Sequence, residues 1–166
     1  MIQMIFRFFS LTFLATLFCL TGSSASEDEK QSPDEIAEWI AIAEQGSAAA
    51  QWLVGYYYAN GKGVLKDEIE AVKWYRKAAE QGYADAQSSL ANCYSNGEGV
   101  GKDEAEAFKW YHKAAEQGDA GVQFLLGLYY STGKGVVKDE VEAVRWWLKA
   151  ADQGNAEEAD FFPLNC

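Results

Sequence analysis

The residues that could carry chemistry begin with one histidine, His112, in a chain of 166 residues. A catalytic triad needs a histidine held by an acid and facing a nucleophile, and a zinc site needs about three or four ligands gathered in space. The sequence around His112 recurs 36 residues earlier and 36 residues later, as described below, and the equivalent positions hold Arg76 and Leu148. The recurring sequence therefore does not require an imidazole at this position. We therefore expect no enzyme activity, no metal site and no cofactor.

Acidic pairs are the second candidate, because paired carboxylates are a common form of catalytic site. Asp67 and Glu70 form the first pair, and the same spacing recurs at positions 103 and 106 and at 139 and 142. An Asp followed three positions later by Glu is also a capping box, in which Asp accepts from a free backbone N–H and Glu reaches back to the cap. We interpret these pairs as helix starts. The Gly-x-Gly loops before them lack both the lysine followed by Ser or Thr and the preceding strand of phosphate-binding loops.

Charge and cysteine content exclude further classes. The net charge of −11 and the absence of a Lys/Arg run argue against binding to nucleic acid or anionic lipid, while a basic partner stays open. If the N-terminal residues 1–25 are removed as a leader, the remaining cysteines are Cys93 and Cys166. A disulfide between them is one possibility in an oxidising compartment, and Cys93 as a small apolar helix residue is the other.

The elements that must position these residues come from a repeat. The sequence KDEIEAVKWYRKAAEQG at 66–82 recurs with few changes at 102–118 and 138–154. A fixed period of this size is typical of a solenoid, in which one unit is unable to bury its own apolar face. The units are 47–82, 83–118 and 119–154, and each is predicted to hold two helices. In the first unit these run from about 48 to 59, ended by Gly61, and from Asp67 onward.

The second helix of each unit has one wide apolar face. In the first unit, the offsets 0, 1, 3, 4, 7 and 8 place six apolar side chains on that face. These are Ala71, Val72, Trp74, Tyr75, Ala78 and Ala79. We expect this face to be buried and the intervening charged residues to be solvated.

The two ends of the chain differ from the repeats. Residues 1–25 have the pattern of a secretory signal peptide, with Arg7, an apolar run at 8–20 and small residues before a cut after Ala25. An uncleaved anchor is the alternative. Residues 26–46 are predicted to be a linker and an N-terminal capping helix, and 155–166 a C-terminal cap and tail. We thus expect an exported protein, periplasmic or secreted, with no stable membrane span after removal of the signal.

Several elements in register resemble the SEL-one-like repeat (SLR), a relative of the tetratricopeptide repeat. They are Val54-Gly55 followed by Tyr58, the Gly-x-Gly-Val loop, Lys-Asp, Ala-x-x-Trp and Lys-Ala-Ala-x-Gln-Gly, and together they cover about residues 33–162. The resemblance implies an all-α, right-handed α/α solenoid of helix–turn–helix repeats. It also implies an adaptor or scaffold for a protein or peptide partner. We expect a monomer.

In that family the first helix of each repeat lines a concave groove. The resemblance therefore implies partner-binding positions there, where the residue type varies between repeats. They are Trp52, Tyr56, Asn92, Phe124 and Leu128. Gln87 and Gln123 are predicted to bind beside them, together with Gln51, at a position that is Gln in every repeat. Exposed aromatic side chains in a groove are typical anchors for a peptide. The other interpretation is that these side chains pack between neighbouring helices, and the sequence leaves both open.

A second function comes from family analogy alone. Some exported members with a cysteine pair in every repeat are linked to β-lactams, so a protein that binds or hydrolyses cell-wall material or β-lactams is the alternative. This chain has Ala78-Ala79 and its equivalents where such members tend to place a cysteine. A purely structural spacer is a third possibility, but it predicts a smooth polar groove, unlike one with Trp52 and Phe124.

Overall fold

The computed structural model describes residues 33–153, and every regular element within that range is a helix. The helices are α1 (Pro33–Glu44), α2 (Ala48–Asn60), α3 (Glu68–Glu80), α4 (Ala84–Asn96), α5 (Glu104–Glu116), α6 (Ala120–Thr132) and α7 (Glu140–Ala151). None of these seven is long and apolar enough to cross a membrane. The predicted signal peptide, linker and C-terminal cap (residues 1–32 and 154–166) lie outside the described residues, as does Cys166.

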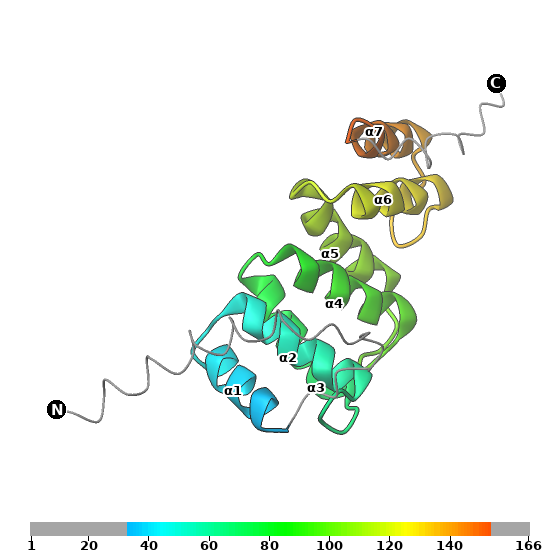
Figure 1. Cartoon of the computed structure of the whole chain (residues 1–166). Coiled ribbons are helices and arrows are strands. Elements are labelled where there is room, and N and C mark those ends of the chain that lie inside the picture. The colour runs from blue at the N-terminus through cyan, green and yellow to red at the C-terminus, as the bar shows by residue number, and fades with distance from the viewer. Residues whose placement is uncertain (1–32, 154–166) are drawn as a thin grey trace, which may run out of the picture. The chain divides into compact units, whose positions relative to one another are not determined.

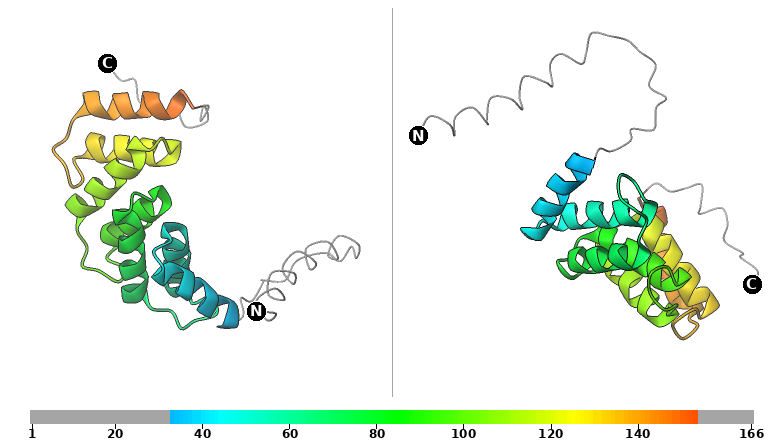
Figure 2. Two further views of the ribbon diagram at one scale, coloured as in Figure 1. Left: turned by 90° about the vertical axis from the view of Figure 1, so that its left-hand side faces the viewer. Right: turned by 90° about the horizontal axis from the view of Figure 1, so that it is seen from below.

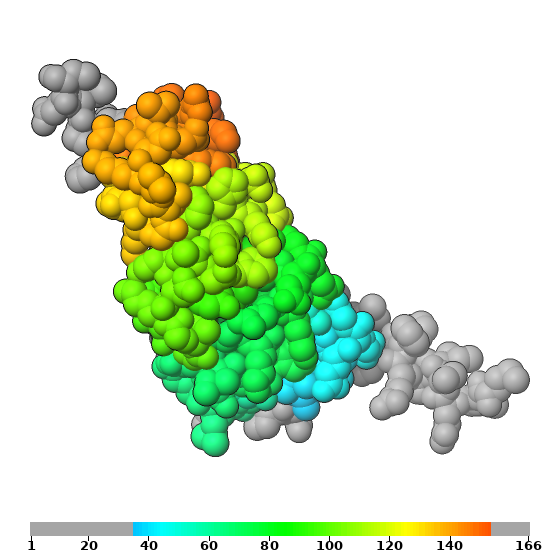
Figure 3. All heavy atoms as spheres, turned by 180° about the vertical axis from the view of Figure 1, so that it is seen from behind, coloured from blue at the N-terminus to red at the C-terminus, as the bar shows by residue number. Residues whose placement is uncertain are grey.

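Consecutive helices pack against one another along the whole described chain. The pairs α2/α3, α4/α5 and α6/α7 form three repeats, and α1 packs on the first of them (Figures 1 and 2). The surface view in Figure 3 shows the repeats as successive layers, coloured from cyan to orange. The all-α repeat solenoid predicted from the 36-residue period is confirmed.

Each second helix begins at the predicted aspartate. The Asp67 carboxylate accepts from the Glu70 backbone N–H at 3.0 Å. The other half of the capping box is different, because the Asp67 N–H donates to the carbonyl of Tyr58 at 2.9 Å. The Glu70 carboxylate instead accepts from Lys73 at 2.7 Å. The same backbone bond recurs in both later repeats, so the cap ties each second helix to the end of the first.

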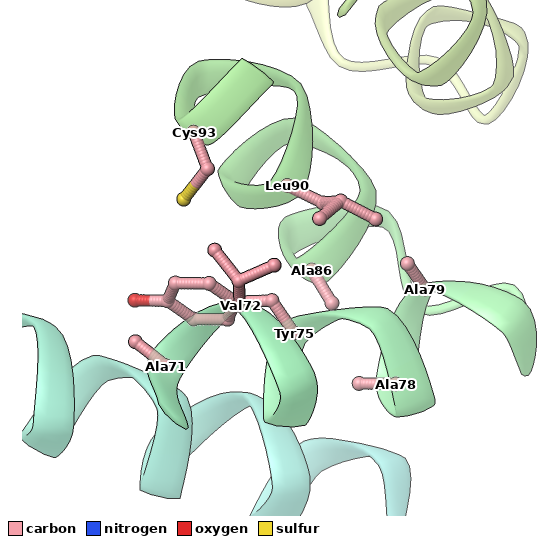
Figure 4. Close-up of a cluster of buried hydrophobic side chains, with 8 residues drawn as sticks. All are labelled: Ala71, Val72, Tyr75, Ala78, Ala79, Ala86, Leu90 and Cys93. Atoms are coloured by element: carbon pink, nitrogen blue, oxygen red, sulfur yellow. The ribbon is translucent and has the colours of Figure 1, made fainter. Parts of the chain in front are cut away.

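The core follows the predicted apolar face. In α3 the buried residues are the six predicted ones, from Ala71 to Ala79. All of them except Trp74 pack on α4 through Ala86, Leu90 and Cys93 (Figure 4). Trp74 packs instead with Ala43 of α1 and with Ala50 and Val54 of α2. Leu90 has no exposed surface. Burial of apolar surface between repeats is therefore the main force that holds one unit on the next.

Glycine permits the closest helix contact within a repeat. A Cβ at Gly55 of α2 would lie 2.7 Å from the ring of Tyr75 in α3, and one at Gly127 would lie 2.3 Å from the Trp147 indole nitrogen. The middle repeat has Ala91 at this position, opposite Tyr111. The second unit thus has Leu90-Ala91 where the third has Leu126-Gly127. This change is accommodated without loss of burial, since Ala91 and Tyr111 are both buried.

Candidate functional site

The aromatic residues predicted for the groove are half-buried and join neighbouring elements. The Trp52 indole N–H donates to the Ser89 hydroxyl of the next repeat at 3.1 Å. Its ring lies 6.1 Å from the Tyr56 ring and 6.0 Å from the Tyr83 ring. Phe124 lies 6.3 Å from the Trp147 ring. These side chains pack between helices and also keep part of their surface exposed, so the two interpretations of the sequence apply together.

The remaining variable positions differ in exposure. Leu128 is half-buried on α6, one turn beyond Phe124. Asn92 is exposed on α4, and its carbonyl oxygen accepts from the Tyr111 hydroxyl. Trp52, Tyr56, Asn92, Phe124 and Leu128 therefore all reach solvent to some degree.

The glutamines predicted beside the groove are buried, with exposures of 5–6%. The Gln87 amide donates to the carbonyl of Ala79 at 3.2 Å, and its oxygen accepts from Gln117 at 2.7 Å. Gln123 makes the equivalent bonds to Ala115 and Gln153, and Gln51 makes those to Ala43 and Gln81. These bonds join the first helix of one repeat to the end of the repeat before it and to its own second helix. They give the glutamines a structural role that the sequence did not indicate.

A pocket of about 330 Å³ lies between the first and second repeats, among α2, α3 and α4. Of the predicted site residues described above, Asn92 lines it. Its other polar lining includes Glu68, Tyr75, Ser89 and Glu98. The available sequence signal was departure from the repeat at several of the lining positions, of which two change the size and the charge of the side chain. Position 93 holds Cys where 57 and 129 hold Tyr, and position 98 holds Glu where 62 and 134 hold Lys.

The charged side chains that line this pocket carry a net negative charge. Lys66 is paired with Glu68 at 2.6 Å, whereas Glu98 is exposed and lies near Lys66 and Cys93. Burial, together with Glu98 and Glu68, raises the pKa of the Cys93 thiol to about 11. Burial likewise raises the pKa of the Tyr75 hydroxyl. Within residues 33–153 Cys93 has no disulfide partner, and its raised pKa keeps the thiol protonated at neutral pH. A protonated thiol is unsuited to nucleophilic attack because the thiolate is the reactive form.

His112 lies on the surface of α5, where its ring is 5.4 Å from the Trp146 ring. Its Nδ1 is 3.6 Å from a carboxylate oxygen of Glu116. Within residues 33–153, no group of three or more His, Cys, Asp or Glu side chains is placed to hold a metal ion. The imidazole thus has an acidic neighbour, Glu116, on its own helix and an aromatic neighbour, Trp146, on α7. These contacts fit a packing role at the surface.

Comparison with solved structures finds two relatives of high identity. A Sel1 repeat protein from Oxalobacter formigenes is 41% identical with a TM-score of 0.72, and the match covers 75% of this chain and 51% of that chain. A protective antigen present in uropathogenic Escherichia coli strains, which displays an SLR fold, is 44% identical with a TM-score of 0.69, covering 72% and 26%. This chain therefore spans about half of the first relative and about a quarter of the second.

A third structure shares the fold. Helicobacter pylori cysteine rich protein B is 23% identical with a TM-score of 0.63, and the match covers 80% of this chain and 98% of that one. No curated protein matches the chain. The model of the Sel1 repeat matches residues 48–83, 84–119 and 120–155, each one residue later than the units read from the sequence. These matches cover more than half of the chain, and the chain therefore belongs to the Sel1 repeat family.

Proposed function

We propose that this protein is an exported adaptor, periplasmic or secreted, that binds a protein or peptide partner on the surface formed by α2, α4 and α6. The observation that carries the proposal is the pair of partly exposed aromatic side chains, Trp52 and Phe124, at equivalent positions of the first and third repeats. Sel1 repeat proteins are generally protein-interaction scaffolds, which supports the same role. The binding residues in this proposal are Trp52, Tyr56, Asn92, Phe124 and Leu128. Gln87 and Gln123 contribute from beneath the surface, by holding the helices that present it.

A preformed surface of this kind lowers the cost of binding. The Trp52 ring is held by Ser89 and by two tyrosine rings, so little side-chain freedom is lost when a partner contacts it. Phe124 also has fixed neighbours, because its backbone carbonyl accepts from the Trp147 indole N–H at 3.1 Å and its ring is tilted against that indole, with the ring centroids 6.3 Å apart. Partly exposed, rigid aromatic groups are common centres of binding energy in interfaces.

Affinity capture tests the proposal directly. The tagged full-length protein would be expressed in its own cells and crosslinked, and its companions identified by mass spectrometry. The Trp52→Ala/Phe124→Ala double variant would be run in parallel, with Trp39→Ala as a control that removes an exposed aromatic from α1. We expect a companion that the wild type and the control retain and that the double variant loses.

Circular dichroism would establish that the double variant keeps its helices, since Trp52 also contributes to packing. Equal capture by a folded double variant would refute the proposed surface. A fluorescent penicillin tests the alternative activity on cell-wall material or β-lactams, for which we expect neither covalent labelling nor turnover.

A further inference from the structure

The interface between the second and third repeats contains an ammonium group supplied by the chain itself. The Lys134 nitrogen lies 3.2 Å from a Glu104 carboxylate oxygen and 3.2 Å from the Ser95 hydroxyl. It also lies 5.0 Å from the centroid of the Tyr129 ring. The Tyr129 hydroxyl donates to Ser95 at 3.1 Å and so occupies the space beside the ammonium. This place between two repeats therefore binds a lysine through a carboxylate, a hydroxyl and an aromatic ring.

The pocket lies at the equivalent place between the first and second repeats. The equivalent residues lie 36 positions earlier in the sequence: Glu68 corresponds to Glu104, Ala59 to Ser95, Cys93 to Tyr129 and Glu98 to Lys134. All four of these residues line the pocket. The carboxylate is kept, the large ring is replaced by a small thiol, and the ammonium is replaced by a second carboxylate.

Loop geometry shows that the two places correspond in space as well as in number. A Cβ at Gly135 would lie 2.0 Å from the Glu104 backbone oxygen, and a Cβ at Gly99 would lie 2.0 Å from the Glu68 backbone oxygen. Both glycines have φ of +67°. The loop after the first helix thus approaches the start of the preceding second helix in the same way at both interfaces, and only the side chains differ.

The local charge changes sign between the two interfaces. Glu104 pairs with Lys102 at 3.1 Å as well as with Lys134, which makes two positive charges to one negative. In the pocket, Lys66 is the counterpart of Lys102, and it faces the two carboxylates Glu68 and Glu98. The pocket is therefore one positive charge short of neutrality.

A hydroxyl of a buried residue faces the same space. Tyr75 is 5% exposed and lines the pocket, and Figure 4 shows its hydroxyl on the same side of the cluster as the Cys93 sulfur. Its counterpart Tyr111 donates a hydrogen bond to Asn92, whereas Tyr56 occupies the equivalent of Asn92 and leaves the Tyr75 hydroxyl without a hydrogen-bond partner among residues 33–153. No fully enclosed polar side-chain atom in that range lacks a partner, so this hydroxyl opens onto the pocket. It is available there to a polar ligand group.

We propose that this pocket binds a primary ammonium group of a partner, as carried by a lysine side chain, in the place that Lys134 occupies in the next interface. The ammonium has three N–H donors, and Glu68, Glu98 and Tyr75 offer oxygen acceptors around the cavity. The aliphatic part of the side chain would contact Ala71 and Cys93. The proposal names the chemistry that a partner brings and so rests on the proposed adaptor role, but a small probe tests the pocket without any partner.

The experiment is a titration of the ¹⁵N-labelled full-length protein, followed by NMR. The probe is Nα-acetyl-lysine methylamide, which keeps the side-chain ammonium. Its control is Nα-acetyl-norleucine methylamide, which lacks only that group. We expect the lysine probe alone to shift the amide signals of Ser89, Asn92, Cys93 and Glu98. Failure of this titration together with successful partner capture would overturn the pocket and leave the adaptor role intact.

Two variants remove the pocket by different means. Glu98→Lys supplies an ammonium from the chain, as Lys134 does, and should weaken the probe at least about tenfold because the local charge is reversed. Cys93→Tyr keeps the charge but fills the cavity, and it should weaken the probe to a similar degree. It should fold, because Tyr129 and Tyr111 pack at 5.3 Å in the next interface, and the new ring would meet Tyr75 in the same arrangement.

Glu80→Lys is the matched control, since it makes the same charge change at an exposed position outside the pocket. We expect Glu80→Lys to bind the probe within about twofold of the wild type. Shifts that are equal for both probes, absent for the lysine probe, or unchanged in folded Glu98→Lys would each overturn the proposal.

Discussion

Gln87→Ala separates a structural role of this side chain from a binding role. The amide of Gln87 is 5% exposed and donates to the Ala79 carbonyl at 3.2 Å. Its oxygen accepts from the Gln117 side chain at 2.7 Å. Through these bonds it holds α4 both to the end of α3 and to the end of α5. Removal of the amide should therefore loosen the contact between two repeats.

The expected cost can be worked from those contacts. Each lost hydrogen bond contributes about 1 kcal/mol to the free energy of unfolding. The Ala79 carbonyl keeps a second donor, the Gly82 N–H at 3.0 Å, so it is not left without a partner. Loss of the buried side-chain atoms adds a cavity term, which brings the total to about 2–3 kcal/mol. For a chain of this size, that corresponds to a melting temperature lower by about 5–10 °C.

Urea unfolding followed by far-UV circular dichroism would measure the change. Gln45→Ala is the matched control, because Gln45 is the counterpart of Gln117 at the end of α1 and is exposed. We expect the control to remain within about 0.5 kcal/mol of the wild type. A similarly small change for Gln87→Ala would refute the structural role. Loss of partner capture with unchanged stability would instead place Gln87 in the binding surface.

Three further changes test the packing, the caps and the charges. Gly127→Ala places a methyl group 2.3 Å from the Trp147 indole nitrogen and should lower the free energy of unfolding by about 1–3 kcal/mol in the same assay. Asp103→Ala removes two 3.0 Å bonds to backbone N–H groups and should cost about 1 kcal/mol, measured as a lower urea midpoint. Desolvation raises the pKa of Glu104, but its two lysine partners outweigh this, so the pKa is lowered on folding. The ionised Glu104 carboxylate therefore stabilises the folded protein at neutral pH, and this contribution is lost as the pH falls through the lowered pKa. Glu104→Gln should be less stable than the wild type by under about 1 kcal/mol at pH 7, and the two should be equally stable well below pH 4. A stability gap for Glu104→Gln that persists in acid would contradict that account.

The local structure could be predicted from the sequence because it depends on neighbours in the chain. The spacing of Ala71, Trp74 and Ala78 identifies the buried face of α3, and the glycines after each first helix identify where it ends. Asp67 identifies the start of the second helix. These signals act within one or two helical turns, so repetition of the sequence implies repetition of the structure.

Contacts between repeats depended on the tertiary structure. Gln87 and Asn92 are both polar and belong to the same helix, yet one is buried and the other is exposed. Only one of the two hydrogen bonds of the predicted capping box forms, because the Asp67 N–H donates to the Tyr58 carbonyl across the loop and not to the Glu70 side chain. The angle at which one helix meets the next decides which side chains are enclosed, and no local pattern encodes that angle.

The sequence by itself determined the number of repeats, the helices within them and the family. Only the tertiary structure showed that two departures from the repeat, Cys93 and Glu98, meet in one place. They are five residues apart on a helix and the following loop, and they become one site because Glu68 and Tyr75 of the previous repeat complete its wall. A missing ring leaves space, and a reversed charge gives that space a preference for a cation. Both effects arise from packing one repeat against the next.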